Sequence, residues 1–282
     1  MIPFRGDLHC HSSCSDGSLK PLELLALAIE KGLQGLSITD HDTIAAYTPD
    51  LFETAKQANI QLLPGVEFST VFQNTSIHVL GYGFDLKNSF ITALCERHRK
   101  RRINRYRAIL QLLHEHQMPI TEEELLATAA AMAPSDQSTT IGRPHIAQAM
   151  LKRHYVESIH EAFKRYLGDG CSCYVQGDYV SPEETIEIIH QAGGVAIIAH
   201  PHIIKNPSVL SQLLKLNFDG IECYYSRFSE KDHKRWVKIA QHHHWLITGG
   251  SDFHGDIKPL ISLGCSWIDE EHFKWIAHRG IL

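Results

Sequence analysis

The first stretch of the sequence that could carry out chemistry is GDLHCHSSCSDG, residues 6–17. Its residues of interest are His9, His11 and Asp16, together with Cys10 and Cys14. Such residues can form a Cys/His zinc cluster, a redox pair of thiols, or part of a metal site built from imidazoles and carboxylates. Because side chains alternate along an extended strand, His9 and His11 face the same side, which suits metal binding. Which of these sites is present depends on the partners that the rest of the chain supplies.

Further histidines and carboxylates follow the apolar runs of the sequence. They lie in ITDHDT, PGVEFS, IHVLGY, AHP and GSDFH, and with the first stretch they give nine candidate ligands: His9, His11, Asp16, His41, Glu67, His78, His200, Asp252 and His254. If the apolar runs are the parallel strands of a βα barrel, their C-terminal ends converge on one face. His78, near the start of its run, departs from this rule and must point inward from within its strand. The joint placement of these residues predicts a metal site.

The types and number of the ligands narrow the choice of metal. Histidine and carboxylate ligands without thiolate suit Mn²⁺, Zn²⁺ or Fe rather than a structural, cysteine-rich zinc site. Nine ligands are too many for one ion, so we expect two or three divalent ions bridged by a carboxylate. Clustered divalent ions stabilise the attacking and leaving oxygens of a phosphoryl displacement.

The composition favours an enzyme of the cytoplasm. The chain has 282 residues, a formal net charge of −5 and 20 histidines. Its 7 cysteines are scattered, which argues against a disulfide scaffold and for a reducing compartment. We expect neither a signal peptide nor a membrane-spanning run, and the net charge does not favour general nucleic-acid binding. Because thiolates have no partner set elsewhere, we expect Cys10 to point away from the histidines and Cys14 to lie in a loop without a ligand role.

The alternation of apolar runs and helical periodicity predicts an α/β fold. Over the first ninety residues, apolar runs alternate with helices expected at 21–32 and 48–58, each with a proline at its start. From about 90 to 167 only helical periodicity remains, interrupted at 132–139. The alternation resumes at Ser181-Pro182-Glu183-Glu184, a capping box. We expect about seven strands in a largely parallel sheet, formed by residues 1–90 and 180–282, with a mainly helical insertion at 91–179.

The motifs and their order resemble those of the PHP (polymerase and histidinol phosphatase) metallophosphoesterases over most of the chain. The sequence is most similar to the bacterial branch of 3′,5′-nucleoside bisphosphate phosphatases and 5′→3′ exoribonucleases, in which an insertion also separates the IHVLGY and AHP motifs. The resemblance implies a distorted (βα)₇ TIM-like barrel, the PHP fold, with the helical insertion as a substrate cap. It also implies a trinuclear site, for which we expect Mn²⁺, with Fe or Zn²⁺ as alternatives and Mg²⁺ as less suited.

The resemblance further implies which residues bind which ion. The first ion would be held by His9, His11, Glu67 and Asp252. The second would be held by Asp16, His41 and His254, and Glu67 would bridge to a third ion completed by His78 and His200. A metal-activated hydroxide would attack phosphorus, with Asp16, His41, Asp252 and His254 as the catalytic set. His202 would line the pocket or protonate the leaving oxygen; the alternative is an ordinary loop histidine.

The insertion supplies the candidate substrate contacts. In CERHRKRRINRYR, Arg102 and Arg105 lie three apart on one helical face and could bind phosphate, although a solvated helix face is the alternative. IGRPHIA places Arg143 and His145 at the start of a helix, whose N-terminus favours anions. Both resemble the arginine/histidine stretch of the family's insertion, and Lys164 in FKRYL resembles another family position. Arg143 could clamp a phosphate through two hydrogen bonds, or could be a capping or surface arginine.

Two further aspartates, Asp40 and Asp42, flank His41. They could orient metal-bound histidines as hydrogen-bond acceptors, or they could be ordinary turn aspartates. The first role would place both carboxylates beside the ligands.

Because all nine ligand positions are filled, we expect an active enzyme. The expected activity is that of a phosphoric ester hydrolase, which removes the 3′-phosphate of nucleoside 3′,5′-bisphosphates or removes nucleotides 5′→3′ from short 5′-phosphorylated RNA. One alternative is a phosphatase of another small ester such as histidinol phosphate. A more remote alternative is a non-catalytic metal- or nucleotide-binding regulator. The expected partners are small nucleotides or short RNA, and neither duplex DNA nor a membrane.

Overall fold

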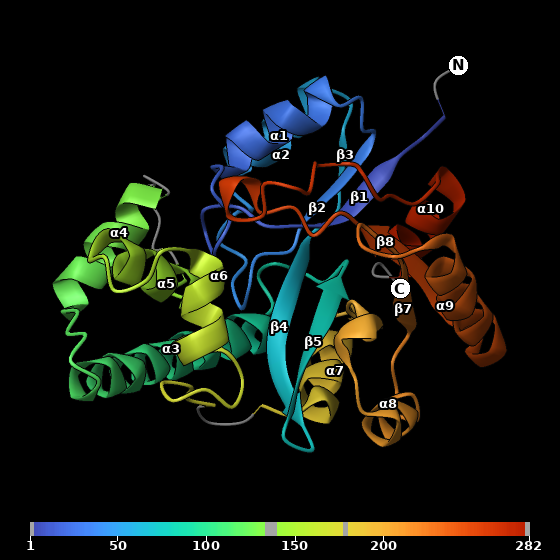
Figure 1. The fold of residues 1–282 in the computed structure, drawn as a ribbon. Helices are drawn as coiled ribbons and strands as arrows, with labels where there is room; N and C mark the ends of the chain where they lie inside the picture. The colour runs from blue at the N-terminus through green and yellow to red at the C-terminus, as the bar shows by residue number, and fades with distance from the viewer. Residues whose placement is uncertain (1–2, 133–139, 177–179, 280–282) are drawn as a thin grey trace.

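The structure is a computed structural model that describes residues 3–132, 140–176 and 180–279 (Figure 1). The interruption that the sequence predicts at 132–139 lies outside these ranges, apart from Met132. Within them the chain forms an α/β fold with eight strands in two sheets.

The two sheets together surround the protein interior. The first is parallel and contains β1 (Gly6–Cys10), β2 (Gly35–Ile38) and β3 (Gln61–Leu62). The second has the order β4 (Gly65–Phe72), β5 (Thr75–Tyr82), β6 (Val195–Ile198), β7 (Gly220–Tyr225) and β8 (Leu246–Gly250). Single residue pairs join the sheets at two seams, His41 with Glu67 and Cys10 with Phe253. The α/β class is therefore confirmed, whereas a closed barrel of seven βα units is not: across the described strands the hydrogen bonding is discontinuous at both seams.

One strand runs against the expected direction. β5 is antiparallel to both of its neighbours, β4 and β6. Its connection to β4 is the two-residue turn Gln73-Asn74, in which both residues have positive φ angles of 48° and 60°. Such a turn matches the twist of a hairpin, so the chain turns back at once without a crossover helix. The prediction of a largely parallel sheet is wrong at this strand.

Six helices flank the strands within the described ranges, and the first three of them begin where the sequence predicts. They are α1 (Pro21–Glu30), α2 (Pro49–Gln57), α7 (Pro182–Gln191), α8 (Pro207–Leu213), α9 (Glu230–His243) and α10 (Glu270–Arg279). Thr48 caps α2 by accepting a hydrogen bond from the amide of Leu51, and Ser181 caps α7 in the same way from that of Glu184. A proline at the first helical position costs no hydrogen bond there and preorganises φ.

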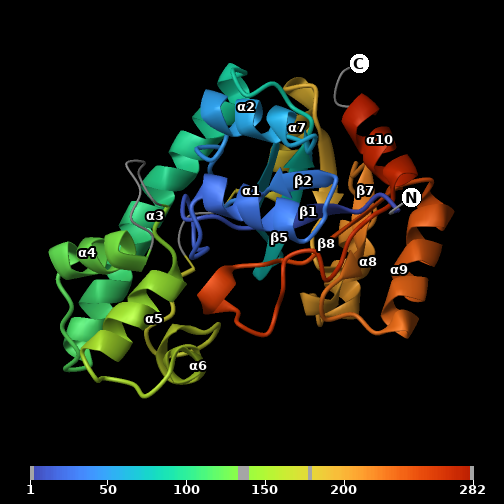
Figure 2. The ribbon, with the colours of Figure 1, turned by 90° about the horizontal axis from the view of Figure 1, so that it is seen from above.

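The segment between β5 and α7 is mainly helical in its described parts. It contains α3 (Ser89–Glu115), α4 (Glu122–Met132), α5 (Arg143–Lys152), α6 (Ile159–Ala162) and the short π-helix η1 (Phe163–Leu167). Figure 2 shows α4, α5 and α6 on one side of the molecule, opposite α9 and α10. These helices have a hydrophobic cluster of their own, which includes Leu113, Leu125, Met150 and Leu167. The start of α3, by contrast, packs Ile91 into the main core.

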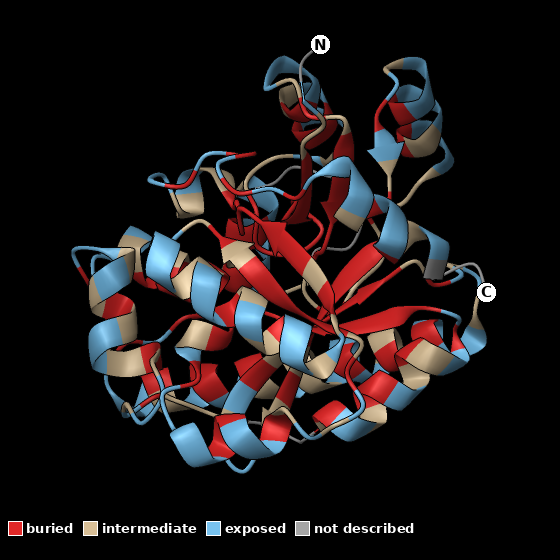
Figure 3. Ribbon diagram, turned by 90° about the vertical axis from the view of Figure 1, so that its right-hand side faces the viewer, coloured by how far each residue is buried: buried red, intermediate tan, exposed pale blue. Residues whose placement is uncertain are grey.

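Most strand residues are buried, except in β3 and at the turn end of the β4–β5 hairpin, whereas the outer faces of the helices are exposed (Figure 3). All five residues of β1 are buried, including the polar Asp7 and His9. Polar groups in such a place need partners, so the interior at the strand ends is where a site is expected. Among the described residues, no helix has the length and apolarity that a membrane span requires.

Candidate metal centre

β1 brings the first two histidines into the protein interior. His9 lies on the strand and His11 directly follows it, and both are fully buried. Their Nε2 atoms lie 3.3 Å and 3.1 Å from the Oε2 atom of Glu67. The spacing of one residue thus directs both rings to the same side of the chain.

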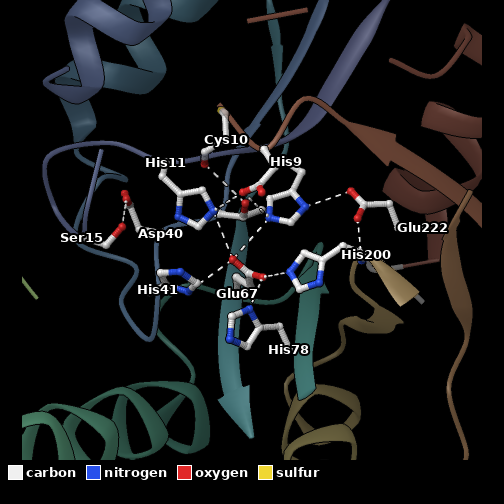
Figure 4. A network of polar contacts seen from close by, with 12 residues as sticks. His9, Cys10, His11, Ser15, Asp40, His41, Glu67, His78, His200 and Glu222 are labelled. Atoms are coloured by element: carbon white, nitrogen blue, oxygen red, sulfur yellow. Dashed lines mark hydrogen bonds and ion pairs between the residues drawn. The ribbon is translucent and has the colours of Figure 1, made fainter. Parts of the chain in front are cut away.

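Glu67 is the centre of the site (Figure 4). It lies on β4 and is 1% exposed. Its Oε2 atom also lies 3.2 Å from Nδ1 of His41. Its Oε1 atom lies 2.7 Å from Nδ1 of His78 and 2.8 Å from Nε2 of His200. One carboxylate therefore contacts five histidines that are far apart in the sequence.

The reversed direction of β5 explains the place of His78. In a parallel strand, a residue so near the start would lie at the end of the sheet away from the other ligands. Because β5 is antiparallel, His78 pairs with Ser69 of β4, two residues beyond Glu67. The sequence predicted that His78 belongs to the site but not how the chain brings it there.

Asp16 and Asp252 add two further carboxylates around His9 and His11. The Oδ1 atom of Asp16 is 3.4 Å from Nε2 of His254 and 3.6 Å from Nδ1 of His11. The Oδ1 atom of Asp252 is 3.4 Å from Nε2 of His11 and 3.5 Å from that of His9. Asp252 follows β8 with a φ of +56°, a conformation that is uncommon for residues other than glycine. All nine candidate ligands, called the ligand cluster below, therefore meet at one place.

The ligand cluster fits divalent cations. Five of its buried atoms have no hydrogen-bond partner: Nε2 of His9, both ring nitrogens of His11, Nδ1 of His41 and Oε2 of Glu67. Buried polar atoms without partners are rare and unfavourable, so their convergence calls for a cation. Three groups of residues each offer donor atoms that all lie within 4.8 Å of one another inside the group. The groups are His11, Asp16, His41 and His254; His9, His11 and Glu67; and His41, Glu67 and His78.

The carboxylates of the cluster are held in the form that binds metal. Burial alone would raise the pKa of Glu67, but His78, His41 and His9 together keep that pKa well below its ordinary value. In the same way, His41 and His254 outweigh burial and keep the pKa of Asp16 well below its ordinary value. Both side chains are therefore anionic at neutral pH and can act as oxygen ligands.

The cysteines take no part in these groups. Cys10 is fully buried, and its Sγ donates to the carbonyl oxygen of Ser37, away from the histidines. Burial raises the pKa of Cys10 well above its ordinary value and that of Cys14 to about 12, so neither is a thiolate at neutral pH. No cysteine of the described ranges belongs to a candidate metal group or a disulfide. A Cys/His zinc cluster and a redox pair are both excluded for GDLHCHSSCSDG.

Three residues that the sequence analysis did not single out form polar contacts with members of the ligand cluster. Glu222 on β7 contacts Nδ1 of His9 at 2.9 Å and accepts a hydrogen bond from the amide of His200 at 2.7 Å. Tyr225 and Lys258 donate to the Oδ2 atom of Asp252 at 2.7 Å and 2.6 Å. The available signal for Glu222 was a single carboxylate within the apolar run GIECYY.

The prediction that Asp40 and Asp42 orient ligand histidines is wrong. Asp40 accepts hydrogen bonds from the amide and hydroxyl of Ser12 and from the hydroxyl of Ser15, and so fixes the segment after β1. Asp42 has a φ of +59°, and its carboxylate accepts from the amide of Ser69 and from Arg102. Each aspartate is next to His41 in the sequence, but its carboxylate forms hydrogen bonds with residues outside the ligand cluster.

The basic stretch of α3 divides into exposed and enclosed arginines. Arg97, Arg99 and Arg107 are exposed and pair with glutamates, as expected for a solvated face. Arg102 is 16% exposed at its side chain and pairs with Asp42. Arg105 donates from Nε to the carbonyl of Val175 at 2.7 Å. Burial, with Arg143 and Arg102 nearby, lowers the pKa of Arg105 to about 10. Arg102, Arg105 and Arg143 are called the arginine cluster below.

The other predicted substrate residues lie in different surroundings. Arg143 begins α5, pairs with Asp169 at 2.9 Å and lies over the ring of Tyr174. His145 is 1% exposed, and its Nδ1 accepts from the amide of Gly142, which makes it part of a helix cap. Lys164 lies exposed on η1. The structure thus brings Arg143 close to Arg105, whereas it places Lys164 at the surface of the helical segment.

His202 lies in the short 3₁₀ helix η2 (Pro201–Ile203), beside the ligand His200. The centre of its ring is 6.4 Å from that of His200, 4.9 Å from that of Tyr225 and 4.8 Å from that of Phe228. Its Nδ1 atom is buried and has no hydrogen-bond partner among the described residues. A role in protonating the leaving oxygen stays a prediction.

Comparison with known proteins matches the chain to one family over most of its length. A family model described as "PHP domain" matches residues 7–198. The 5'-3' exoribonuclease Rnm of Escherichia coli is 31% identical over 276 residues, which is 96% of this chain and 89% of that protein. The 3',5'-nucleoside bisphosphate phosphatase of Chromobacterium violaceum is 30% identical over 256 residues, 88% of this chain and 86% of that protein.

A solved structure supports the same relationship. A protein of Bifidobacterium adolescentis, assigned as a metal-dependent phosphoesterase, superposes with a TM-score of 0.86 at 31% sequence identity. The match covers 97% of this chain and 96% of that one, so the helical segment is included together with the strands.

Proposed function

The chain belongs to the PHP domain family, and from this premise we propose that this phosphoesterase acts on small 5′-phosphorylated nucleotides. Its reactions would be release of the 3′-phosphate of nucleoside 3′,5′-bisphosphates and removal of nucleotides 5′→3′ from short RNA. The observation that carries the proposal is the convergence of nine imidazoles and carboxylates in one place, with five of the histidines around Glu67, next to a group of enclosed arginines. The names of the relatives from E. coli and C. violaceum support both reactions.

The proposed cofactor is a set of two or three divalent ions, Mn²⁺ in the first place. His9, His11, Glu67 and Asp252 would hold one, and Asp16, His41 and His254 a second, with Glu67, His78 and His200 for a third. When bound, such ions lower the pKa of a water molecule and neutralise charge on the phosphoryl oxygens. Mixed nitrogen and oxygen ligands fit Mn²⁺, Fe and Zn²⁺ better than Mg²⁺, which prefers oxygen ligands alone.

The residues around the ligands define a rigid reaction site. Tyr225 and Lys258 occupy one oxygen of Asp252, which leaves Oδ1 directed at the cluster. Asp40 fixes the segment that carries Asp16 through its bonds to Ser12 and Ser15. A reacting group held in one geometry needs little reorganisation during the reaction, and this accounts for much of enzymatic rate enhancement.

The helical segment 91–179 is the proposed substrate cap, and the arginine cluster is its proposed phosphate site. Arg102 is neutralised by Asp42, and Arg143 pairs with Asp169, whose side chain is 61% exposed. Among the described residues, Arg105 contacts a carbonyl oxygen but no carboxylate. Counted over the described residues alone, three arginines pair with two carboxylates, which leaves one positive charge that a substrate 5′-phosphate could balance. His145 and Lys164 would have supporting roles, His145 by capping α5 and Lys164 at the outer edge.

The proposal is tested by product analysis with three substrates in excess Mn²⁺. We expect adenosine 3′,5′-bisphosphate to give adenosine 5′-monophosphate and phosphate, and a 5′-phosphorylated diribonucleotide to give mononucleotides. Histidinol phosphate is the comparison substrate for the alternative activity. Faster turnover of histidinol phosphate than of either nucleotide would overturn the substrate proposal. Bound metal without hydrolysis of any phosphate ester would show a non-catalytic regulator instead.

A further inference from the structure

Glu222 is a buried carboxylate that is not itself one of the ligands. It lies within β7 and is 0% exposed. In the part of the chain that the structure describes, the one ionisable group that pairs with it is His9. A carboxylate in the interior is costly without a partner, so its two contacts need an explanation.

The first contact determines which nitrogen of His9 can bind metal. The Oε1 atom of Glu222 lies 2.9 Å from Nδ1 of His9 (Figure 4). An acceptor at this distance favours the proton on Nδ1. The lone pair of the neutral ring is then on Nε2, the atom that faces Glu67 at 3.3 Å and Asp252 at 3.5 Å.

The second contact holds the backbone of another ligand. The Oε2 atom of Glu222 accepts a hydrogen bond from the amide of His200 at 2.7 Å. His200 has a φ of +25°, which L residues rarely adopt, and a strained residue keeps such a conformation only where its surroundings hold it. This conformation directs Nε2 of His200 to Oε1 of Glu67 at 2.8 Å.

His9 and His200 thus lie between two carboxylates. The centres of their rings lie 5.7 Å apart with the planes inclined by 28°, and Glu67 lies on the side of the cluster while Glu222 lies on the far side of His9. We propose that Glu222 is a positioning residue that holds two ligands from separate strands, so that metal binding at both of their places depends on this one side chain. The inference rests on the proposed metal centre and adds a residue to it that touches no metal.

The chain offers a closely matched control. Asp219, just before β7, also contacts one imidazole and accepts from one backbone amide: Nε2 of His190 at 2.7 Å and the amide of Ala196 at 2.8 Å. His190 is not a ligand, so the Asp219→Asn variant loses similar bonds without any effect on the ligand cluster. Glu222→Gln keeps the size of the side chain but removes its charge and one acceptor.

The experiment is a calorimetric titration of metal-free protein with Mn²⁺, for wild type, Glu222→Gln and Asp219→Asn. We expect Glu222→Gln to weaken two binding steps by about ten- to hundredfold, as for other carboxylates that orient metal-bound histidines. Asp219→Asn should bind as wild type does. Equal Mn²⁺ affinity and stoichiometry in Glu222→Gln and wild type would overturn the inference. Wild-type protein that binds no Mn²⁺ would instead overturn the proposed metal centre.

A second measurement does not depend on the folding of a variant. Nitrogen-15 NMR of wild-type protein loaded with diamagnetic Zn²⁺ reports the protonation of each ring nitrogen. We expect His9 to carry its proton on Nδ1 and to bind through Nε2. The opposite arrangement, with Nδ1 bound to the metal, would show that Glu222 does not orient this ring.

Discussion

The ligand cluster and the arginine cluster hold their charged groups in different ways. The ligands come from strands or the residues just after them, and His9, His11 and Glu67 are at most 1% exposed. The arginines come from helices of the segment 91–179 and are less completely enclosed, and one of them, Arg143, pairs with the exposed Asp169, which a substrate could replace. A buried group with fixed partners is suited to one reaction. A partly exposed group with a replaceable partner is suited to binding and release, so the proposed function assigns chemistry to the first region and substrate choice to the second.

The strongest test of this division is the loss of a ligand. Asp252→Asn keeps the size of the side chain but removes the charge directed at His9 and His11. We expect kcat to fall by about 10²- to 10³-fold, the scale of losing a preorganised electrostatic contact, while circular dichroism shows an intact fold. Activity close to that of wild type would contradict the place of Asp252 in the ligand cluster.

Removal of metal should affect the strands and leave the helical segment intact. A ligand at a hundred times its Kd stabilises a protein by about 2.7 kcal/mol, so we expect chelation to lower the Tm by about 5–10 °C and to abolish activity. Hydrogen exchange should then rise at β1, β4 and β5 but not in α4 and α5. Addition of Mn²⁺ should restore the activity and the protection. A uniform rise in exchange, including α4 and α5, would show that the two regions are not independent.

Loss of Arg105 should weaken substrate binding and leave metal binding unchanged, in contrast to the loss of a ligand or of the metal. We expect Arg105→Gln to raise KM for adenosine 3′,5′-bisphosphate about ten- to hundredfold, the usual effect of losing one charge-assisted hydrogen bond. Affinity for Mn²⁺ should stay unchanged, as should turnover of a small ester without a 5′-phosphate. Arg107→Gln is the control, since Arg107 lies on the same helix but is exposed and pairs with Glu122. Equal KM values in the two variants would remove Arg105 from the phosphate site.

The smallest effect is expected for a substitution outside both clusters, at His190, and it concerns stability rather than activity. The hydrogen bond to Asp219 raises the pKa of His190 in the folded state, although burial opposes it. A raised pKa stabilises the protein below the unfolded value of about 6.5, and this contribution is lost as the pH rises through the folded value. We expect His190→Gln to lose up to about 1 kcal/mol of unfolding free energy at pH 5.5, and less at pH 8.5. Denaturant titration at both pH values measures it, and kcat should not change.

The ligand positions could be predicted from the sequence because each lies in a short motif next to an apolar run. Apolar runs identify strands, and residues next to them are brought to the rim of the sheets. The β4–β5 hairpin was not recognisable, because Gln73-Asn74 is not the Asn-Gly or Asp-Gly pair that marks such turns. The α/β class was therefore correct, whereas the barrel of seven βα units was not confirmed and the direction of one strand was wrong.

Partners that come from distant parts of the chain could not be predicted. Asp42 follows His41 directly, but its φ of +59° accompanies a carboxylate that faces Ser69 and Arg102. Glu222 carries none of the signals of a ligand motif, because its contacts come from β1 and from the residue that follows Ala199. A motif shows which side chains are available, whereas the backbone conformation and the tertiary contacts decide what each one touches.

The direction of β5 also determines where the helical segment 91–179 is attached to the sheet. Since β5 ends beside the starts of β4 and β6, the chain leaves the sheet at the end away from the ligands. There, Asp85 and Asn88 bond to the last turn of α7, and α3 then runs alongside α7 until Arg102 reaches Asp42. With 27 residues, α3 is about 40 Å long. The position of an arginine along this helix therefore sets its distance from the end of the sheet where α3 begins. Adding or removing one turn near its start would shift Arg102 and Arg105 along the helix axis by about 5 Å and change which phosphate positions they can reach, while every residue of the ligand cluster stays the same.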